Sequence, residues 1–136
     1  MRAFSIASWV AVGVGLTLAA IPARAHHSFA SEFDTNKPVT LTGTVTKVEW
    51  ENPHARFYLD VKDDSGMIVH WEFQMGSVNV LVRGGWTRDT MKSGDTVTVN
   101  GYSAKDGAHL ANARGVTLSD GRKLTGGSSY AGEATP

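Results

Sequence analysis

Cysteine is absent from the 136 residues of this chain. Its absence excludes disulfide bonds, thiolate zinc sites and cysteine nucleophiles. Small exported domains often rely on disulfides for their stability. We therefore expect this fold to be held together by its apolar core or by a bound ligand.

Recognisable enzyme motifs are absent as well. The sequence contains no HExxH zinc motif, no serine in a nucleophile elbow and no glycine pattern of a phosphate-binding loop. Asp63 and Asp64 belong to a hairpin turn sequence, so they do not indicate a catalytic pair of carboxylates. We predict that the protein is not an enzyme.

The charge balance excludes one class of partner. The chain has 13 basic and 13 acidic residues, and two of the basic ones, Arg2 and Arg24, lie within the first 25 positions. Loss of that segment would leave a small net negative charge. Nucleic-acid binding needs a strongly basic surface, so we expect no nucleic-acid partner.

One long apolar run is present, at the start of the sequence. Arg2 precedes it, residues 4–21 are apolar except for three hydroxyl residues, and residues 23–25 form a small-x-small sequence. A membrane-spanning helix is the alternative, because about 20 apolar residues cross a bilayer. We predict a signal peptide over residues 1–25, cleavage after Ala25, export to the periplasm and no membrane partner after cleavage.

The remainder is predicted to be mostly β-strands separated by turns. Strands are expected at residues 39–50, 57–61, 67–74, 96–103 and 110–118, with a short added strand at 123–124. A helix is expected at 77–83, with Ser77 as its N-cap, Gly84-Gly85 as its stop, and Val78, Leu81 and Val82 on its apolar face. In the first strand the apolar residues switch from odd-numbered to even-numbered positions near Val48. This switch predicts a bulge at Gly43 or Lys47. Trp86 is expected to pack beneath the helix, and residues 87–91 to add a helical turn.

Three strands, a short helix and two strands follow the order of the OB-fold, a five-stranded, partly open small barrel. The sequence therefore predicts an all-β, OB-fold-like barrel over residues 39–126, after a leader at 26–38 and before a disordered tail at 127–136. A β-sandwich is the alternative, although five strands are few for that fold.

The segments that carry a family resemblance are "AHHSFASEFD", "VTLTGTVTKVEWENPHARFYLDV", "GGWTRDTMKSGDTVTVNGYSAKDG" and "ANARGVTLSDGRKL". With their WxNPHA and KxGDxVxVxGY motifs, they resemble an uncharacterised family of small exported bacterial proteins, a domain of unknown function. The resemblance covers residues 26–128 and implies an OB-fold-like domain, without implying an activity.

Two adjacent histidines, His26 and His27, follow the predicted cleavage site directly. Cleavage would give His26 a free α-amino group, whose ordinary pKa of about 8 lets a metal displace its proton. The amine and the Nδ1 of His26 could then chelate Cu(II), as the first half of a histidine brace. His27 offers a competing mode through its own imidazole, and a soluble leader without a partner is the alternative.

Two further histidines fall in predicted loops. His54 lies between strands one and two, and His109 lies between strands four and five; both loops flank the usual ligand site of an OB-fold. The alternatives are a local backbone hydrogen bond for His54 and simple exposure for His109. We predict His26, His27 and His54 as metal ligands and His109 as a ligand-binding residue.

Most aromatic side chains of the predicted strands are expected in the core, and Tyr58 is expected on the opposite face, where OB-folds stack ligands. We therefore add Tyr58 to the ligand-binding residues. Together the features predict a monomeric periplasmic binding protein of unknown ligand, with copper as the candidate metal. An accessory module of a periplasmic complex, binding a protein partner over Tyr58, His70 and Glu72, is the alternative, and oligosaccharide binding is a third interpretation.

Overall fold

The computed structural model describes residue 29 and residues 31–128. The predicted signal peptide, His26, His27 and most of the predicted tail lie outside the described residues. In the part of the chain that is described, no helix is long and apolar enough to cross a membrane.

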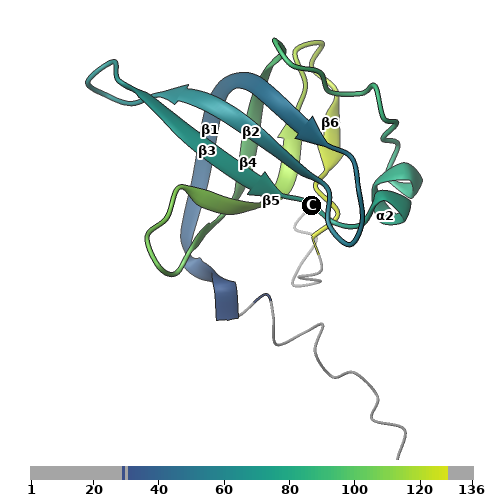
Figure 1. Ribbon diagram of the computed structural model, residues 1–136, viewed down its shortest axis with the longest axis horizontal. Helices are drawn as coiled ribbons and strands as arrows, with labels where there is room; N and C mark the ends of the chain where they lie inside the picture. Colours follow the sequence, from purple (N-terminus) through teal and green to yellow (C-terminus); the bar gives the residue numbers. More distant parts are fainter. Residues whose placement is uncertain (1–28, 30, 129–136) are drawn as a thin grey trace, which may run out of the picture.

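The described chain belongs to the all-β class, and a short helix, α2, lies between its strands (Figure 1). Its elements are β1 (Phe33–Glu49), β2 (Arg56–Lys62), β3 (Ile68–Gln74), α2 (Val78–Arg83), β4 (Thr96–Ala104), β5 (Leu110–Thr117) and β6 (Lys123–Thr125). The predicted order of strands and helix is confirmed. The predicted start of the first strand at Val39 is wrong, because β1 begins at Phe33, which pairs with Ala104.

The six strands form one sheet in the order β3-β2-β1-β4-β5-β6. An additional parallel pairing joins β3 to β5, with Glu72 opposite Leu110 and Gln74 opposite Asn112. Hydrogen-bonded pairing therefore runs in a cycle from β1 through β2, β3, β5 and β4 back to β1.

Strand β1 is long because it pairs with β4 along its first half and with β2 along its second half. Thr44 is the point of exchange, with Asp60 of β2 on one side and Thr96 of β4 on the other. The register shifts between Val45 and Lys47, so a bulge is confirmed next to Lys47 and not at Gly43. Such a bulge lets β1 bend from one partner strand to the other.

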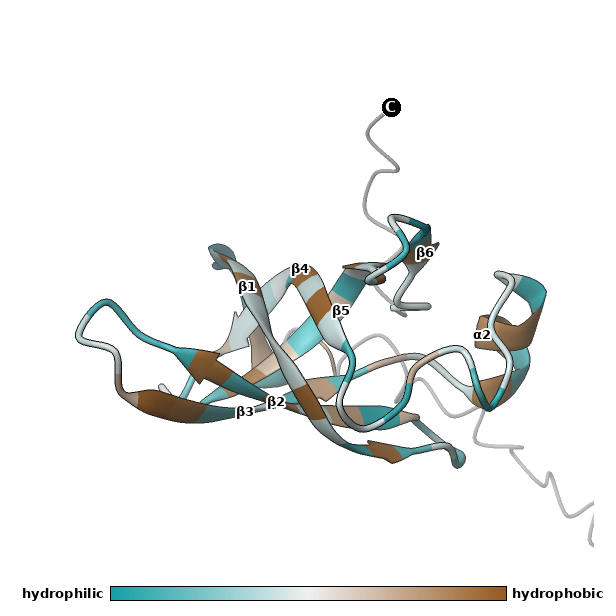
Figure 2. Ribbon diagram, turned by 90° about the horizontal axis from the view of Figure 1, so that it is seen from above, coloured by the Kyte–Doolittle hydropathy of each residue, from teal (hydrophilic) through white to brown (hydrophobic). Residues whose placement is uncertain are grey.

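The core is built from the alternating apolar positions of the strands. Phe57, Leu59 and Phe73 are fully buried, and the Phe57 and Phe73 rings stack with centroids 5.1 Å apart. Figure 2 shows these apolar stretches interleaved with polar ones along the strands. The alternation means that one face of the sheet fills the interior, and the polar positions form the outer face.

Helix α2 has the ends that the sequence predicts. The Ser77 side chain accepts a hydrogen bond from the Val80 amide, and Gly84 is the C-cap. Leu81 is buried against the core, whereas Val82 is 53% exposed and is not part of the buried face that the sequence predicts. The helix is too short to bury more than one side chain fully.

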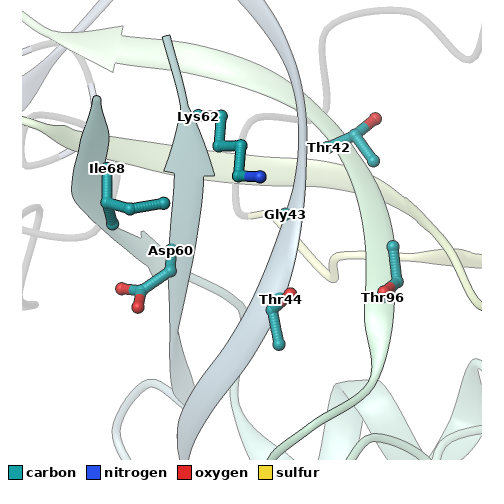
Figure 3. A pocket seen from close by; sticks show the side chains of 7 residues that line it. All are labelled: Thr42, Gly43, Thr44, Asp60, Lys62, Ile68 and Thr96. Atoms are coloured by element: carbon teal, nitrogen blue, oxygen red, sulfur yellow. The ribbon is translucent and has the colours of Figure 1, made fainter. Parts of the chain in front are cut away.

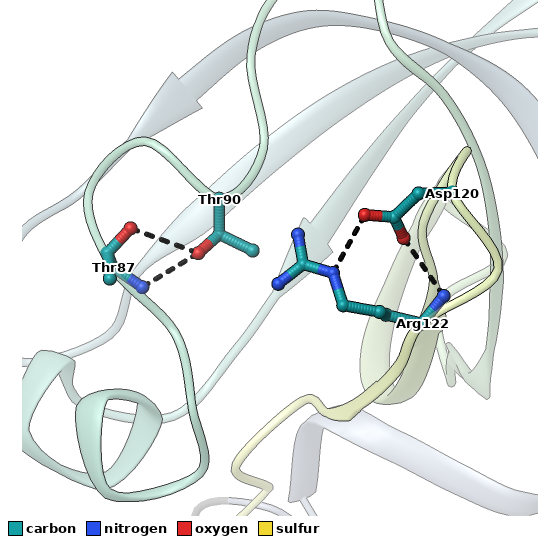
Figure 4. Close-up of polar contacts among 4 residues, drawn as sticks. All are labelled: Thr87, Thr90, Asp120 and Arg122. Atoms are coloured by element: carbon teal, nitrogen blue, oxygen red, sulfur yellow. Dashed lines mark hydrogen bonds and ion pairs between the residues drawn. The ribbon is translucent and has the colours of Figure 1, made fainter.

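Residues 87–91 do not form the predicted helical turn. They form a hydrogen-bonded turn in which the Thr90 hydroxyl accepts from the Thr87 amide at 2.8 Å (Figure 4). The neighbouring turn between β5 and β6 is closed by Asp120, whose carboxylate accepts from the backbone amide and the guanidinium of Arg122. Both loops thus satisfy their own polar groups locally.

The two ends of the sheet differ in what they carry. Helix α2 lies at one end, and the turn between β2 and β3 projects at the opposite end in both Figure 1 and Figure 2. Met67 and Ile68, next to this turn, are 66% and 47% exposed. The projecting hairpin therefore presents apolar side chains to solvent.

Candidate functional site

His54 lies in the loop between β1 and β2 and is half-buried. Its Nδ1 lies 3.1 Å from the backbone carbonyl oxygen of Met75, just after β3. Because a carbonyl oxygen only accepts hydrogen bonds, this contact requires the proton on Nδ1. The Nε2 of the neutral ring is then left with a lone pair, which is the form that binds a metal.

His109 lies before β5 and is exposed. Its ring packs against Trp71 with centroids 5.1 Å apart, and its carbonyl oxygen accepts from the Glu72 amide at 3.0 Å. Trp71 in β3 and Met75 just after it are four residues apart along extended chain, which corresponds to roughly 13 Å. The structure therefore does not bring His109 and His54 together.

The chain just after the predicted N-terminal histidines is fixed on the sheet. Phe29 is 7% exposed and Phe33 is 2% exposed, and their rings lie 5.3 Å apart. The Lys105 amide also donates to the Glu32 carbonyl oxygen at 2.9 Å. Phe29, Glu32 and Phe33 are thus anchored where β4 ends.

This anchor and His54 are linked by one row of residues across the sheet. The Phe29 ring lies 6.5 Å from the Tyr102 ring, edge to face. Tyr102 pairs with Asn112, and Asn112 pairs with Gln74, the residue before the Met75 acceptor. Since neighbouring strands lie about 4.8 Å apart, the row from Tyr102 to Gln74 is roughly 10 Å long.

Tyr58 lies on the outer face of β2 and is half-buried, and within the described chain it forms no hydrogen bond, ion pair or ring contact with His54 or His109. Its hydroxyl donates to Glu49 at 3.3 Å, and the Lys47 ammonium lies 5.6 Å from its ring centroid. Burial raises the pKa of Tyr58, and the carboxylates of Glu72 and Glu49 raise it further. The phenol therefore stays protonated in the neutral range.

Charged side chains surround Tyr58 in pairs. Arg56 Nη1 lies 2.8 Å from Glu72, and Lys47 Nζ lies 2.7 Å from Glu49. The hydrogen bond from Lys47 holds the pKa of Glu49 below its ordinary value. His70 is exposed, and its Nδ1 contacts the carboxylate of Asp60.

Residues 14–113 match a family of unknown function, DUF6152. This chain belongs to that family. The matched range contains all five histidines and every described strand as far as the middle of β5. A comparison with the curated proteins found none that matches this chain.

Within the described part of this DUF6152 chain, no group of three or more histidine, cysteine or acidic side chains is placed to hold a metal ion. His54 is separated from His109, and His26 and His27 lie outside the described residues. A metal site of the predicted composition therefore depends on how His54 and the N-terminal residues come together.

One notable side chain was missed by the sequence reasoning. Asn112 is 3% exposed, and in the described part its Oδ1 has no hydrogen-bond partner, while its Nδ2 donates to the Gln74 carbonyl oxygen at 3.5 Å. The alternation around Ala111 and Ala113 would place Asn112 on the outer face of β5. No local signal predicts that this outer position is covered.

Proposed function

We propose that this protein is an exported, non-enzymatic copper-binding protein with an OB-fold-like barrel, and that His26, His27 and His54 supply the metal ligands. The proposal depends on the predicted cleavage of the signal peptide after Ala25. Export would place the protein in the periplasm, and cleavage would expose the amino group of His26. The ligands combine one loop histidine with the first two residues of the mature chain.

The cyclic strand pairing supports the OB-fold assignment. An OB-fold is a five-stranded, partly open barrel, and its short helix follows the third strand. Here pairing joins β3 to both β2 and β5, and α2 lies between β3 and β4. The loop that holds His54, between β1 and β2, is one of the two loops that flank ligands in this fold.

The orientation of His54 is the observation that carries the proposal. Histidines that bind metals usually donate their other ring N–H to a backbone carbonyl or a carboxylate, which fixes both tautomer and ring orientation. His54 has this arrangement, with Nδ1 against the Met75 carbonyl oxygen at 3.1 Å. Its Nε2 is thereby prepared to bind a metal.

The length of chain before Phe29 is compatible with a shared site. His26 lies three residues before Phe29, and three extended residues span up to roughly 10 Å. The row from Tyr102 to Gln74 has about the same length, and it ends beside the residue that holds His54. A shared site therefore requires the residues before Phe29 to extend along this row and the histidine side chains to close the remaining distance, because the Phe29 and Tyr102 rings are themselves 6.5 Å apart.

The chemistry of the ligands favours Cu(II). The α-amine and Nδ1 of His26 form a compact chelate, and imidazoles from His27 or His54 can add further nitrogen ligands. Cu(II) prefers tetragonal nitrogen ligation and has the highest affinity in the divalent series. A chain without cysteine offers no thiolate that would favour other soft-metal sites instead.

The test uses protein exported through its own signal and purified without a tag. Intact mass should begin at His26, and competition with a chelator should show one Cu(II) held far more tightly than by a free His-His peptide. His54→Ala and His26→Ala should each weaken copper binding at least tenfold, since each removes one nitrogen ligand. His70→Ala is the matched control and should leave the affinity unchanged.

Selective acetylation of the α-amine of His26 gives a sharper test, because it keeps both imidazoles and removes only the amine as a ligand. Copper binding that survives acetylation would exclude the amine as a ligand. Affinity equal to that of a free His-His peptide would reject the proposed function as a whole.

An accessory role in a periplasmic complex is the second candidate, and it is favoured by the shared outer face of Tyr58, His70 and Glu72. The register places Tyr58 opposite Glu72, and His70 opposite Asp60 in the next outward row. A partner would cover this face. Crosslinking from position 58 in periplasm, with a position on β6 as the control, should capture one specific protein; no such product would reject this role.

A further inference from the structure

The surface of the sheet carries a further feature near Lys62, at the C-terminal end of β2. It is an open groove of ≈ 430 Å³ on the outer face of the sheet (Figure 3). Its lining side chains come from four strands: Thr42, Thr44, Asp60, Lys62, Ile68 and Thr96.

The groove forms because β1 and β2 separate there. Thr44 and Asp60 are the last paired residues of these strands, and continuation of the register would have placed Thr42 opposite Lys62. Instead, β1 turns to β4, with Thr42 opposite Thr98. Gly43 allows the turn, since a Cβ there would fall within 2.4 Å of the Asp60 carbonyl oxygen. The groove thus results directly from the change of pairing partner of β1 from β2 to β4.

The groove combines one cation, one carboxylate and several hydroxyls. Lys62 is exposed and extends from β2 toward Gly43 (Figure 3), and none of the salt bridges found among the described residues involves it. The Asp60 Oδ1 contacts His70, which leaves Oδ2 to accept another hydrogen bond. The hydroxyls of Thr44 and Thr96 can donate or accept.

The apolar part of the groove is aliphatic. Ile68 is 47% exposed and forms one wall. None of the described residues that line the groove is aromatic, so they offer no stacking surface for nucleic-acid bases.

We propose that this groove binds an acidic oligosaccharide, with Lys62 pairing with the carboxylate of a uronic acid unit. The Thr44 and Thr96 hydroxyls and the free oxygen of Asp60 bind sugar hydroxyls, and Ile68 packs against the C–H face of the ring. An open groove accommodates a segment of a longer chain, whose other units extend into solvent.

The groove is separate from His54, the one proposed copper ligand among the described residues. His54 and Lys62 are eight residues apart along an extended segment, which corresponds to roughly 26 Å. Sugar binding and copper binding can therefore be measured independently, and the failure of one proposal leaves the other standing.

The experiment is an NMR titration of the isotope-labelled mature protein, free of copper, with trigalacturonate. Amide shifts should concentrate at Thr42, Thr44 and Thr96. Lys62→Gln should weaken binding about tenfold, because it removes a charge-assisted hydrogen bond at an exposed site. Lys123→Gln, which changes an exposed lysine on β6, should bind like the parent protein.

The methyl ester of the same trimer keeps the sugar hydroxyls and removes the charges. It should bind at least about tenfold more weakly than the acid. Shifts absent from the groove at saturating trimer, full binding by Lys62→Gln, or equal binding of acid and ester would each overturn the proposal.

Discussion

The indole Nε1 of Trp86 donates a hydrogen bond to the Thr125 carbonyl oxygen at 2.8 Å. This bond joins the loop after α2 to the last strand, β6, across 39 positions of sequence. Trp86 is 2% exposed, and its ring lies 6.4 Å from that of Trp50. The residue predicted to pack beneath the helix therefore also holds the C-terminal strand.

We expect Trp86→Phe to lower the free energy of unfolding by about 2 kcal/mol, because it removes the hydrogen bond and leaves part of a cavity. Urea denaturation followed by circular dichroism measures the change. Trp50→Phe is the control, since Trp50 is half-buried, and it should cost clearly less. Equal losses in the two variants would show that the bond to Thr125 contributes nothing.

Gly101→Ala is expected to prevent folding or to cost at least about 3 kcal/mol through overpacking. A Cβ at Gly101 would lie 1.8 Å from the carbonyl oxygen of Asn112, where β4 and β5 approach closely. Soluble yield and thermal unfolding measure the effect. Gly107→Ala has no atom within 4 Å of its Cβ and carries only the strain of a φ of 80°, so it should fold. A stable Gly101→Ala protein would contradict the β4–β5 register.

Asn112 should tolerate an apolar replacement better than a charged one. Its Oδ1 has no partner in the described part, so Asn112→Leu relieves a buried polar group and should change stability by less than about 1 kcal/mol. Asn112→Asp places a carboxylate at a covered position and should cost about 3 kcal/mol at neutral pH. Urea midpoints of both variants test this ordering. If Asn112→Leu were the more damaging of the two, a hidden partner of Oδ1 would be indicated.

The turn between β2 and β3 should weaken in acid. The hydrogen bond from the Ser65 hydroxyl, at 2.6 Å, lowers the pKa of Asp63, and the backbone amides of Met67 and Ser65 lower it further. The folded pKa is thus below the unfolded value of about 3.9. The stabilising contribution is complete above that value and is lost as the pH falls through the folded pKa.

Melting temperatures of the parent protein and Asp63→Asn from pH 7 to pH 2 test this expectation. The difference between the two proteins should shrink as the pH falls below about 4. Asp64→Asn is the matched control, since Asp64 makes none of these hydrogen bonds within the described chain, and its difference should show less dependence on pH. A melting-temperature difference between the parent protein and Asp63→Asn that does not change with pH would show that the Asp63 carboxylate does not stabilise the turn.

The structure confirms the elements that were predicted from sequence features a few residues long. Ser77 and Gly84 bound the helix as expected, because capping depends on the few residues next to the helix end. Strand positions followed from alternation in the same way, and the β2–β3 hairpin formed where Asp63 and Gly66 make a turn. Alternation also predicted the existence of a bulge in β1, although the register places it at Val45–Lys47.

The arrangement of the histidines depended on strand pairing between distant parts of the chain. Sequence placed His54 and His109 in two loops that flank the same site in an OB-fold, yet the parallel register of β3 with β5 sets them at different heights. The same register covers Asn112, although its neighbours in sequence suggest an exposed position. Neither outcome has a local signal, because the partners are far apart in sequence.

The sequence by itself therefore determined the all-β class, the order of the elements and the ends of the helix, since backbone propensity, alternation and capping act over a few residues. The tertiary structure decided which side chains meet: His54 with the Met75 carbonyl oxygen, Trp86 with Thr125, and Lys62 with the groove left by the turn of β1. These contacts depend on the pairing register of strands that are far apart in sequence. That register is fixed because every strand has to bury the same apolar face.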